Sequence, residues 1–326
     1  MPRKFINQLT EGENIDQAFL VAEKQLRTNR AGNLYLQMRL ADKSGMLTAM
    51  LWNANDKVNS SFEGGDYVNV QGTTQFYNGA MQVIVSRVHK VDVSQVDEQD
   101  FVTLNTANLE KLSRRLSELL RGIRDYHLRN LAECFLVDEA FMSRFSRAPA
   151  GIKHHHAYHG GLLEHVVNLM EVVAAVSPFY PDVNADLLLM GAFLHDAGKI
   201  EELTYDREFS YSDVGQLLGH LVIGVGMVDE KVREAEKLSG EPFPEELALR
   251  LKHMILSHHG QYDHGSPKLP MTLEALMLHY LDSLDAKIHN ALQLMREDAT
   301  GDANWTAYQP NIQRKLYKSG LQETAE

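Results

Sequence analysis

Cysteine is nearly absent from this chain of 326 residues, whose single example is Cys134. One cysteine cannot form an internal disulfide or supply a cysteine-type zinc site, so we interpret Cys134 as a small core residue. The sequence also shows no apolar run behind a basic N-terminus and no apolar stretch of about 18 residues. We therefore expect a cytoplasmic protein without a membrane partner.

Positive charge is also scarce, because 32 Lys and Arg stand against 44 Asp and Glu and give a formal net charge of −12. This balance argues against a generic polyanion-binding surface. The charge is uneven: residues 1–90 hold ten Lys and Arg against eight Asp and Glu, and the remaining residues hold 22 against 36. The acidic larger part suits cation binding, whereas the first part can still approach a phosphate backbone.

The first 91 residues have the patterns of short β-strands. Alternating apolar residues and turn signals predict strands over residues 18–25, 34–40, 46–52, 66–74 and 81–91. A short helix is expected over 55–62, and Asn78-Gly79 is a strong hairpin signal. Five strands with a small helix between the third and fourth resemble an OB-fold, a Greek-key barrel that binds single-stranded nucleic acid.

Aromatic and basic side chains on these strands are candidates for contacts with bases and backbone. Stacking of a base on an aromatic ring stabilises binding by roughly 1–3 kcal/mol and tolerates any sequence. The alternative is that the aromatic rings fill the barrel core or its ends. The candidate nucleic-acid-binding residues are Tyr35, Arg39, Trp52, Phe76 and Tyr77.

The rest of the chain reads as helical. Residues 92–104 resemble an acidic linker, and 105–150 predict connecting helices with apolar stripes. Residues 151–300 predict an all-α bundle, and 301–326 a tail in which basic and aromatic residues alternate. We expect the helix over 184–194 to stop at Gly198 through a positive φ.

Histidines and aspartates occur on separate apolar helices of this bundle or at their ends. Such residues can converge in the interior, where helical bundles build metal sites. Imidazole and carboxylate groups without thiolate suit Mn, Fe, Zn or Ni. The candidates are His165, His195, Asp196, His220, His258, His259 and Asp282. Because seven ligands exceed the need of one ion, we predict two ions bridged by Asp196, about 3.5–4 Å apart.

The order His165, His195-Asp196, Asp282 resembles the signature of the HD superfamily of metal-dependent phosphohydrolases. His220 and His258-His259 resemble the dinuclear branch of that superfamily. The stretches HHAYHGGLLEH, FLHDAGK, LSHHG and HYLDSLDAK are similar to the YhaM-type 3′–5′ exoribonucleases. The resemblance spans nearly the whole chain. It implies an N-terminal OB-fold before an HD domain, the seven ligands named above, and divalent ions, with Mn favoured over Mg, Fe, Ni or Zn.

Further residues receive roles from their position beside these motifs. Asp196 and Lys199 are the candidate catalytic residues, with Lys199 placed to meet a phosphate oxygen; the alternative is a cation that offsets a helix dipole. His155 and His159 are candidate phosphate contacts, or members of a solvated loop. Asp285 either orients a ligand or pairs with Lys287.

The leading hypothesis is metal-assisted hydrolysis of single-stranded RNA, or DNA, from the 3′ end. The first alternative is a phosphohydrolase of small nucleotides whose OB domain serves assembly or regulation, which the acidic net charge favours. The second is a non-catalytic nucleic-acid-binding protein with a structural metal. The sequence leaves a homo-oligomer open.

Overall fold

Two compact units make up the protein. One comprises Met1–Thr103 with Ala291–Glu326, and the other comprises Leu104–Asn290. The structure is a computed structural model, and it describes residues 3–29, 32–77, 80–97, 100–101, 106–151, 158–205, 210–296, 298 and 304–318. The domain boundaries expected from the sequence stay predictions.

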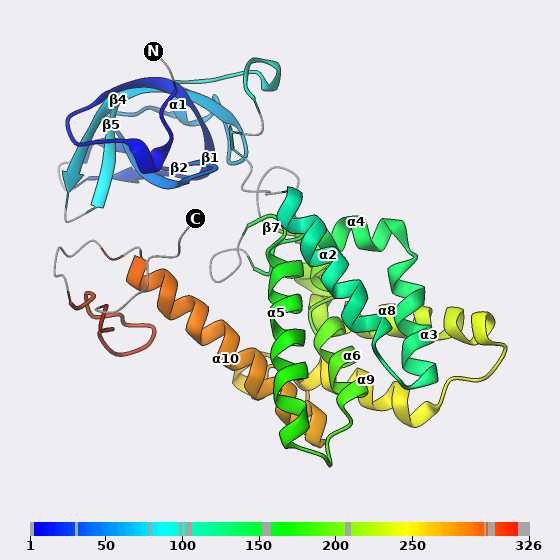
Figure 1. Cartoon of the computed structure of the whole chain (residues 1–326). Helices are drawn as coiled ribbons and strands as arrows, with labels where there is room; N and C mark the ends of the chain where they lie inside the picture. Colours follow the sequence, from blue (N-terminus) through cyan, green and yellow to red (C-terminus); the bar gives the residue numbers. More distant parts are fainter. Residues whose placement is uncertain are drawn as a thin grey trace. The chain divides into compact units, whose positions relative to one another are not determined.

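The first unit contains a closed five-stranded barrel (Figure 1). The strands join in the order β1-β2-β3-β5-β4, and β3 and β5 are parallel while the other neighbours are antiparallel. This confirms the predicted OB-fold barrel. The elements are β1 (Asn14–Thr28), β2 (Leu34–Asp42), β3 (Gly45–Trp52), α1 (Asp56–Asn59), β4 (Tyr67–Tyr77) and β5 (Ala80–Lys90), flanked by η1 (Ile6–Gln8) and η2 (Val93–Gln95).

Alternation along β2 shows why these residues form a barrel strand. Leu36, Met38 and Leu40 are fully buried, whereas Arg39 between them is exposed. The first strand is longer than predicted, because β1 pairs with β4 at its beginning and with β2 at its end. Its polar ends carry no apolar alternation that sequence patterns detect. The Asn78-Gly79 hairpin signal lies outside the described residues.

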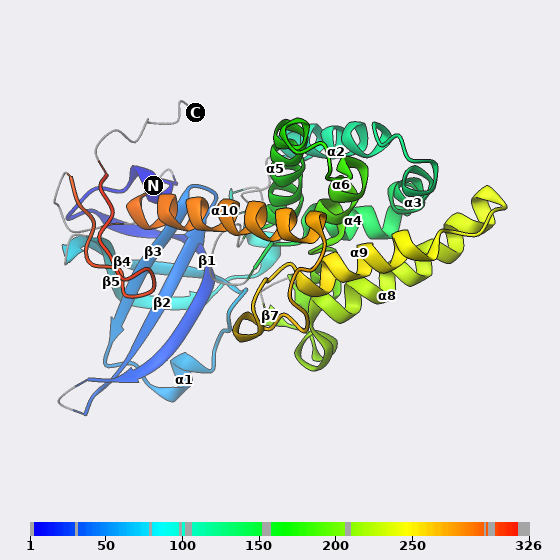
Figure 2. The same ribbon diagram turned by 90° about the horizontal axis from the view of Figure 1, so that it is seen from below.

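The second unit is a helical bundle, as predicted, and its described residues also form two strands of two residues each. Figure 2 shows α8 and α9 side by side. The helices are α2 (Thr106–Arg121), α3 (Tyr126–Leu136), α4 (Glu139–Arg147), α5 (Gly161–Val176), η4 (Ser177–Phe179), α6 (Ala185–Leu194), α7 (Lys199–Glu202), α8 (Asp213–Ser239), α9 (Glu245–Ser257), η5 (Tyr262–His264) and the part of α10 (Leu273–Arg296) up to Asn290. The strands β6 (Leu203–Thr204) and β7 (Ser210–Tyr211) pair with each other.

Aromatic side chains and polar helix caps fix the bundle core around α6. Phe193 of α6 meets Phe135, Phe141 and Phe145 edge to face, with ring centroids 5.5 to 6.2 Å apart. Such pairs add about 0.5–1.5 kcal/mol beyond the burial of their area. The Asn184 side chain accepts a hydrogen bond from the Leu187 amide and starts α6. The last turn of α6 is therefore held inside the bundle.

One helical segment corrects the expectation about long apolar stretches. Gly161–Phe179 is long and apolar enough, by composition, to cross a membrane, although Glu164 and His165 interrupt its apolar run. Half of its most apolar window is buried in the protein, and the core helix of a soluble protein passes the same test. The packing of α5 explains its composition, because its apolar residues contribute to the bundle core.

We expect Asp138→Ala to lower the free energy of unfolding by about 1–2 kcal/mol at pH 7, the usual effect of losing an N-cap. The Asp138 carboxylate accepts from the Phe141 amide at 2.9 Å and from Lys231 Nζ at 2.8 Å. The Lys231 bond, together with the amide bond, lowers the pKa of Asp138 below its ordinary 3.8. Its stabilisation is therefore present above about pH 4 and is lost as pH falls through the lowered pKa.

Urea unfolding at several pH values measures this contribution. The difference in the free energy of unfolding between wild type and Asp138→Ala should decrease as pH falls from 5 toward 2. Asp125→Ala is the control, because Asp125 caps α3 through the Leu128 amide and has no lysine partner among the described residues. A difference in unfolding free energy between wild type and Asp138→Ala that stays the same down to pH 2 would contradict the prediction.

Candidate metal centre

The centre begins at the end of α6, where a buried helix delivers His195 and Asp196. His195 is the C-cap residue, and its Nδ1 lies 2.9 Å from the carbonyl oxygen of Ala192. Both side chains are almost fully buried. An imidazole and a carboxylate are costly to bury without partners, so their surroundings decide what they do.

Gly198 is required for close packing, and the predicted positive φ is wrong, since its φ is −62°. A Cβ at Gly198 would lie 2.1 Å from the carbonyl oxygen of His220 and 2.9 Å from the amide nitrogen of Gly224. The missing side chain thus lets α8 approach the turn after Asp196. Within α8, Gly219 interrupts the helix with φ 73° and ψ 156°, directly before His220.

One group of candidate ligands comes from α5, α6 and α10. The Nε2 atom of His165 lies 3.2 Å from His195 Nε2 and 3.2 Å from Asp282 Oδ1. His195 Nε2 lies 3.7 Å from the same Asp282 oxygen. These three atoms are close enough to share one ion.

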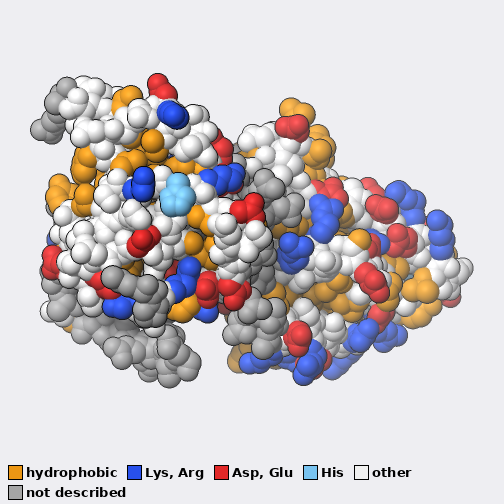
Figure 3. Space-filling view, turned by 90° about the horizontal axis from the view of Figure 1, so that it is seen from above, with side chains coloured by type: hydrophobic (Ala, Val, Ile, Leu, Met, Phe, Trp, Pro, Cys, Tyr) orange, Lys and Arg blue, Asp and Glu red, His pale blue; other side chains and the backbone are white. Residues whose placement is uncertain are grey.

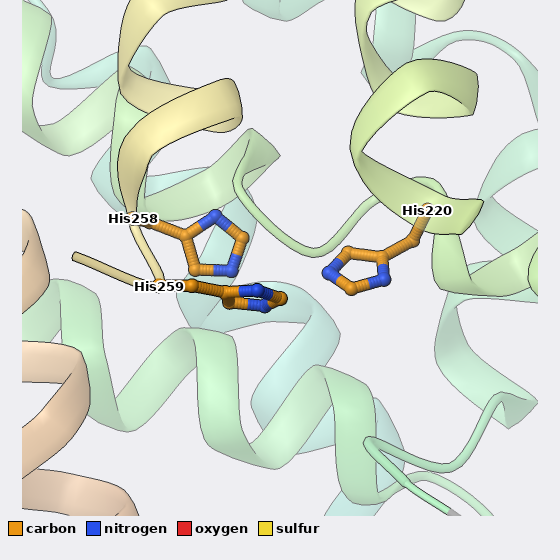
Figure 4. Close-up of side chains that lie close together, drawn as sticks. All are labelled: His220, His258 and His259. Atoms are coloured by element: carbon orange, nitrogen blue, oxygen red, sulfur yellow. The ribbon is translucent and has the colours of Figure 1, made fainter. Parts of the chain in front are cut away.

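A second group comes from α8 and the end of α9. In Figure 4 the rings of His258 and His259, at adjacent positions, lie toward the ring of His220 from α8. One nitrogen from each of the three rings falls within 4.8 Å of the others. Gly260, with φ 77°, follows these two histidines and turns the chain away.

Asp196 lies between the two groups. Its Oδ1 atom is 3.5 Å from His220 Nε2 and 3.6 Å from His258 Nε2. Its Oδ2 atom is 3.4 Å from His195 Nε2 and 3.9 Å from His165 Nε2. Each oxygen therefore faces one group of candidate ligands, as a bridging carboxylate would.

Buried polar atoms without partners indicate what the centre accepts. Among the described residues, Asp196 Oδ1, His220 Nε2 and His259 Nδ1 have no hydrogen-bond partner. Such atoms are rare in native interiors because each costs free energy. A divalent cation satisfies carboxylate oxygens and imidazole nitrogens together, so the residues fit a metal.

Electrostatics keep the carboxylates ionised and one histidine neutral. Burial raises the pKa of Asp196, but Lys199 and His195 outweigh it and hold that pKa well below its ordinary value. Burial also opposes ionisation of Asp282, yet the His165 hydrogen bond lowers its pKa. Burial and the nearby His195 hold the pKa of His258 well below its ordinary value. Ionised carboxylates and neutral imidazole are the forms that bind metal.

Two carboxylates beside His165 favour its protonated form in the metal-free arrangement. Burial lowers the pKa of His165, but hydrogen bonds with Asp282 and Asp285 outweigh it and raise the pKa to about 9. Its proton therefore stabilises two carboxylates that a cation would otherwise neutralise.

The remaining predicted residues lie as follows. Lys199 Nζ donates to Asp196 Oδ2 at 2.6 Å and to the carbonyl oxygen of Ala150 at 2.7 Å. His159 Nδ1 lies 3.4 Å from the carbonyl oxygen of Arg147, and His155 falls outside the described residues. The structure therefore brings together the seven candidate ligands and Lys199, while contacts of His155 and His159 with phosphate stay predictions.

Glu202 was missed by sequence reasoning. Its Oε1 atom accepts from the backbone amide of His220 and lies 2.9 Å from His220 Nδ1. From the sequence, Asp285 either orients a ligand or pairs with Lys287. In the structure its Oδ2 lies 2.8 Å from His165 Nδ1. Nothing in the local sequence signals Glu202, because Lys199-Ile-Glu-Glu202 reads as one turn of a surface helix.

The barrel candidates lie on its strands with different exposures. Trp52 is 45% exposed, Phe76 53% and Tyr77 61%, so these rings do not fill the core. Tyr35 is half-buried, with its ring centroid 5.2 Å from that of Trp52, and Arg39 is exposed. On the face seen in Figure 3, Lys and Arg are scattered among Asp and Glu and do not form one basic stripe. Binding of nucleic acid by these residues stays a prediction.

Comparisons with known proteins agree with both parts of the chain. Residues 162–287 match the HD domain family, and residues 20–91 match the OB-fold nucleic acid binding domain family. The curated 3′–5′ exoribonuclease YhaM of Geobacillus sp. (strain WCH70) is 34% identical over 281 residues, which are 85% of this chain and 84% of that protein.

Solved structures show more distant likenesses. An NMR structure of the second OB-fold domain of replication protein A from Methanococcus maripaludis has 17% identity and a TM-score of 0.23, over 27% of this chain and 94% of that one. A crystal structure of a domain of the same protein has 17% identity and a TM-score of 0.24, with the same coverage.

We expect Mn²⁺ to raise the melting temperature of the helical unit. An ion at 100 times its dissociation constant stabilises the folded state by about 2.7 kcal/mol. For a domain of 150–250 residues this corresponds to roughly 5–10 °C. Chelation with EDTA should reverse the shift, and Asp196→Ala should abolish most of it because both ligand groups lose their shared carboxylate.

Differential scanning calorimetry with and without Mn²⁺ measures the effect. His264→Ala is the control, because His264 is an exposed histidine outside the two groups. Equal shifts in wild type and Asp196→Ala would show that the ion binds elsewhere.

Proposed function

We propose that this chain, which belongs to the family of the 3′–5′ exoribonuclease YhaM, shortens single-stranded RNA from its 3′ end by metal-dependent hydrolysis of phosphodiester bonds. The observation that carries the proposal is the position of Asp196. Its two oxygens face two groups of candidate ligands, and both groups come from helices far apart in the sequence.

Two divalent ions, with Mn favoured, are the economical occupants of this centre. One position is framed by His165, His195 and Asp282, and the other by His220, His258 and His259. Asp196 belongs to both. Imidazole and carboxylate donors without thiolate suit manganese and its neighbours in the first transition row. When bound, such ions activate water at neutral pH and offset the charge of the phosphodiester.

Lys199 completes the charge balance of the centre. An ammonium group has three donors, and two of them here go to Asp196 and to the Ala150 carbonyl. Its side chain keeps 16% exposure, and a phosphate oxygen of the substrate is the partner that we propose for the third donor. In this role Lys199 holds Asp196 in place and binds the phosphate of the RNA.

The barrel would hold the strand upstream of the scissile bond. Tyr35, Trp52, Phe76 and Tyr77 offer rings for base stacking, and Arg39 offers a cation for the backbone. The alternative substrate is a small nucleotide, which the net charge of −12 favours. In that case the barrel would serve assembly or regulation.

Asp196→Ala should reduce the release of nucleotides by at least about 1,000-fold, because metal catalysis contributes several kcal/mol to lowering the barrier. A single-stranded RNA labelled at its 5′ end should give a ladder that shortens from the 3′ end in wild type with Mn²⁺. His264→Ala should act as wild type does. Unchanged shortening by Asp196→Ala would reject this centre as the catalyst.

The double variant Trp52→Ala/Phe76→Ala should raise the KM for a long single strand by roughly 10- to 100-fold, as expected from losing one or two base stacks. Its turnover of bis-p-nitrophenyl phosphate should stay unchanged. Phe179→Ala is the matched control, since Phe179 is a 79%-exposed aromatic residue of the helical unit. An unchanged KM for RNA would remove the barrel from substrate binding and favour the small-nucleotide alternative.

A further inference from the structure

Each of the four buried histidines of the centre has a hydrogen-bond partner at its Nδ1 atom, and these partners are of two kinds. His195 Nδ1 and His258 Nδ1 each lie 2.9 Å from the carbonyl oxygen three residues earlier in the chain. Each is the C-cap residue of its helix, so these bonds use carbonyls that the helix end leaves free. For these two rings, the hydrogen-bond partner of Nδ1 is the backbone of their own helix.

The other two histidines are held by carboxylates. His165 Nδ1 lies 2.8 Å from Asp285 Oδ2, and His220 Nδ1 lies 2.9 Å from Glu202 Oε1. Each ligand group thus contains one carbonyl-held and one carboxylate-held histidine. Carboxylates behind histidine ligands fix the ring tautomer and raise the basicity of the other nitrogen.

We infer that Glu202 is the positioning residue for the ion held by His220, His258 and His259, and that it corresponds to Asp285 at the other position. A carboxylate only accepts hydrogen bonds when ionised, so His220 Nδ1 carries the proton. In the neutral ring, His220 Nε2 is then the atom with a free electron pair. That atom is buried, lacks a partner among the described residues, and lies 3.5 Å from Asp196 Oδ1.

The break in α8 explains why one glutamate does two tasks. Gly219 leaves helical geometry, and the amide of His220 donates to the same Glu202 Oε1 at 2.9 Å. One carboxylate oxygen therefore binds both the backbone and the ring of His220. Glu202 is only 8% exposed, so little water competes for these bonds. The backbone position and the ring orientation of His220 are fixed together.

Backbone contacts hold the Glu202 main chain independently of its carboxylate. The carbonyl oxygen of Glu202 accepts from the Ser212 amide at 2.9 Å. A Cβ on Gly215 would lie 2.1 Å from that same oxygen, so α8 packs directly on it. Glu202→Gln keeps the shape of the side chain and all of these contacts. The variant therefore tests the carboxylate with little risk to the fold.

Titration of the metal-free protein with Mn²⁺, followed by calorimetry and by the EPR signal of free Mn²⁺, tests the inference, which rests on the two-ion site proposed above. Glu202→Gln should weaken one of the two binding steps by about 10- to 100-fold, the usual effect of losing such a partner. The other step should be unchanged. Asp285→Asn should show the reverse selectivity.

Two further variants make the result specific. Glu201→Gln is the matched control, because Glu201 is adjacent, exposed and paired with Arg144, and it should leave both steps unchanged. In a His220→Ala background, Glu202→Gln should have no further effect on Mn²⁺ affinity, because the imidazole ring that Glu202 orients is absent. A merely structural role for Glu202 would still weaken binding in that background.

The outcomes separate this inference from the proposed function. If wild type binds Mn²⁺ in two steps and Glu202→Gln binds both ions equally well, the inference is overturned and the exoribonuclease proposal stands. If wild type binds no Mn²⁺, the two-ion proposal itself fails. Should Glu202→Gln lower the melting temperature of the metal-free protein, comparison with Glu202→Gln/His220→Ala still decides whether the carboxylate acts through His220.

Discussion

Burial of the Asp196 carboxylate is the constraint on which the helical unit depends. A carboxylate that is almost fully removed from water needs strong partners, and here Lys199 and the surrounding histidines supply them. Four helices must end, begin or break at the right places to deliver those partners. The apolar character of α6, the break in α8 and the turn after α9 all serve this requirement.

The ligand groups could be predicted from the sequence because their residue types are chemically distinctive. Histidine and aspartate at the ends of apolar helices have few structural uses, so His195-Asp196 and His258-His259 were visible without coordinates. Glu202 was invisible, because a glutamate in a short polar helix has the same pattern on a solvated surface. Its function arises only when Gly219 breaks α8 and turns His220 toward it.

The errors have the same origin. The glycine after Asp196 was read as a local stop signal, yet its conformation is ordinary and the tight neighbour is a segment about 20 residues away. Likewise, β1 is longer than predicted because two different strands pair with its two ends. Local patterns report which residues are apolar or turn-forming, whereas contacts between distant segments decide how these residues are used. The barrel was predictable because alternation within β2 to β5 is itself local.

Two glycines beside the centre have no room for a side chain. Gly198 and Gly215 bind nothing, yet a single methyl group on either would strike a backbone oxygen at 2.1 Å. The oxygens belong to His220 and Glu202, the two residues whose alignment sets one side of the centre. A Gly→Ala substitution at either position would therefore force the backbone of His220 or Glu202 to move. The residues that this site allows are therefore limited by the space beside two glycines as well as by the choice of metal-binding side chains.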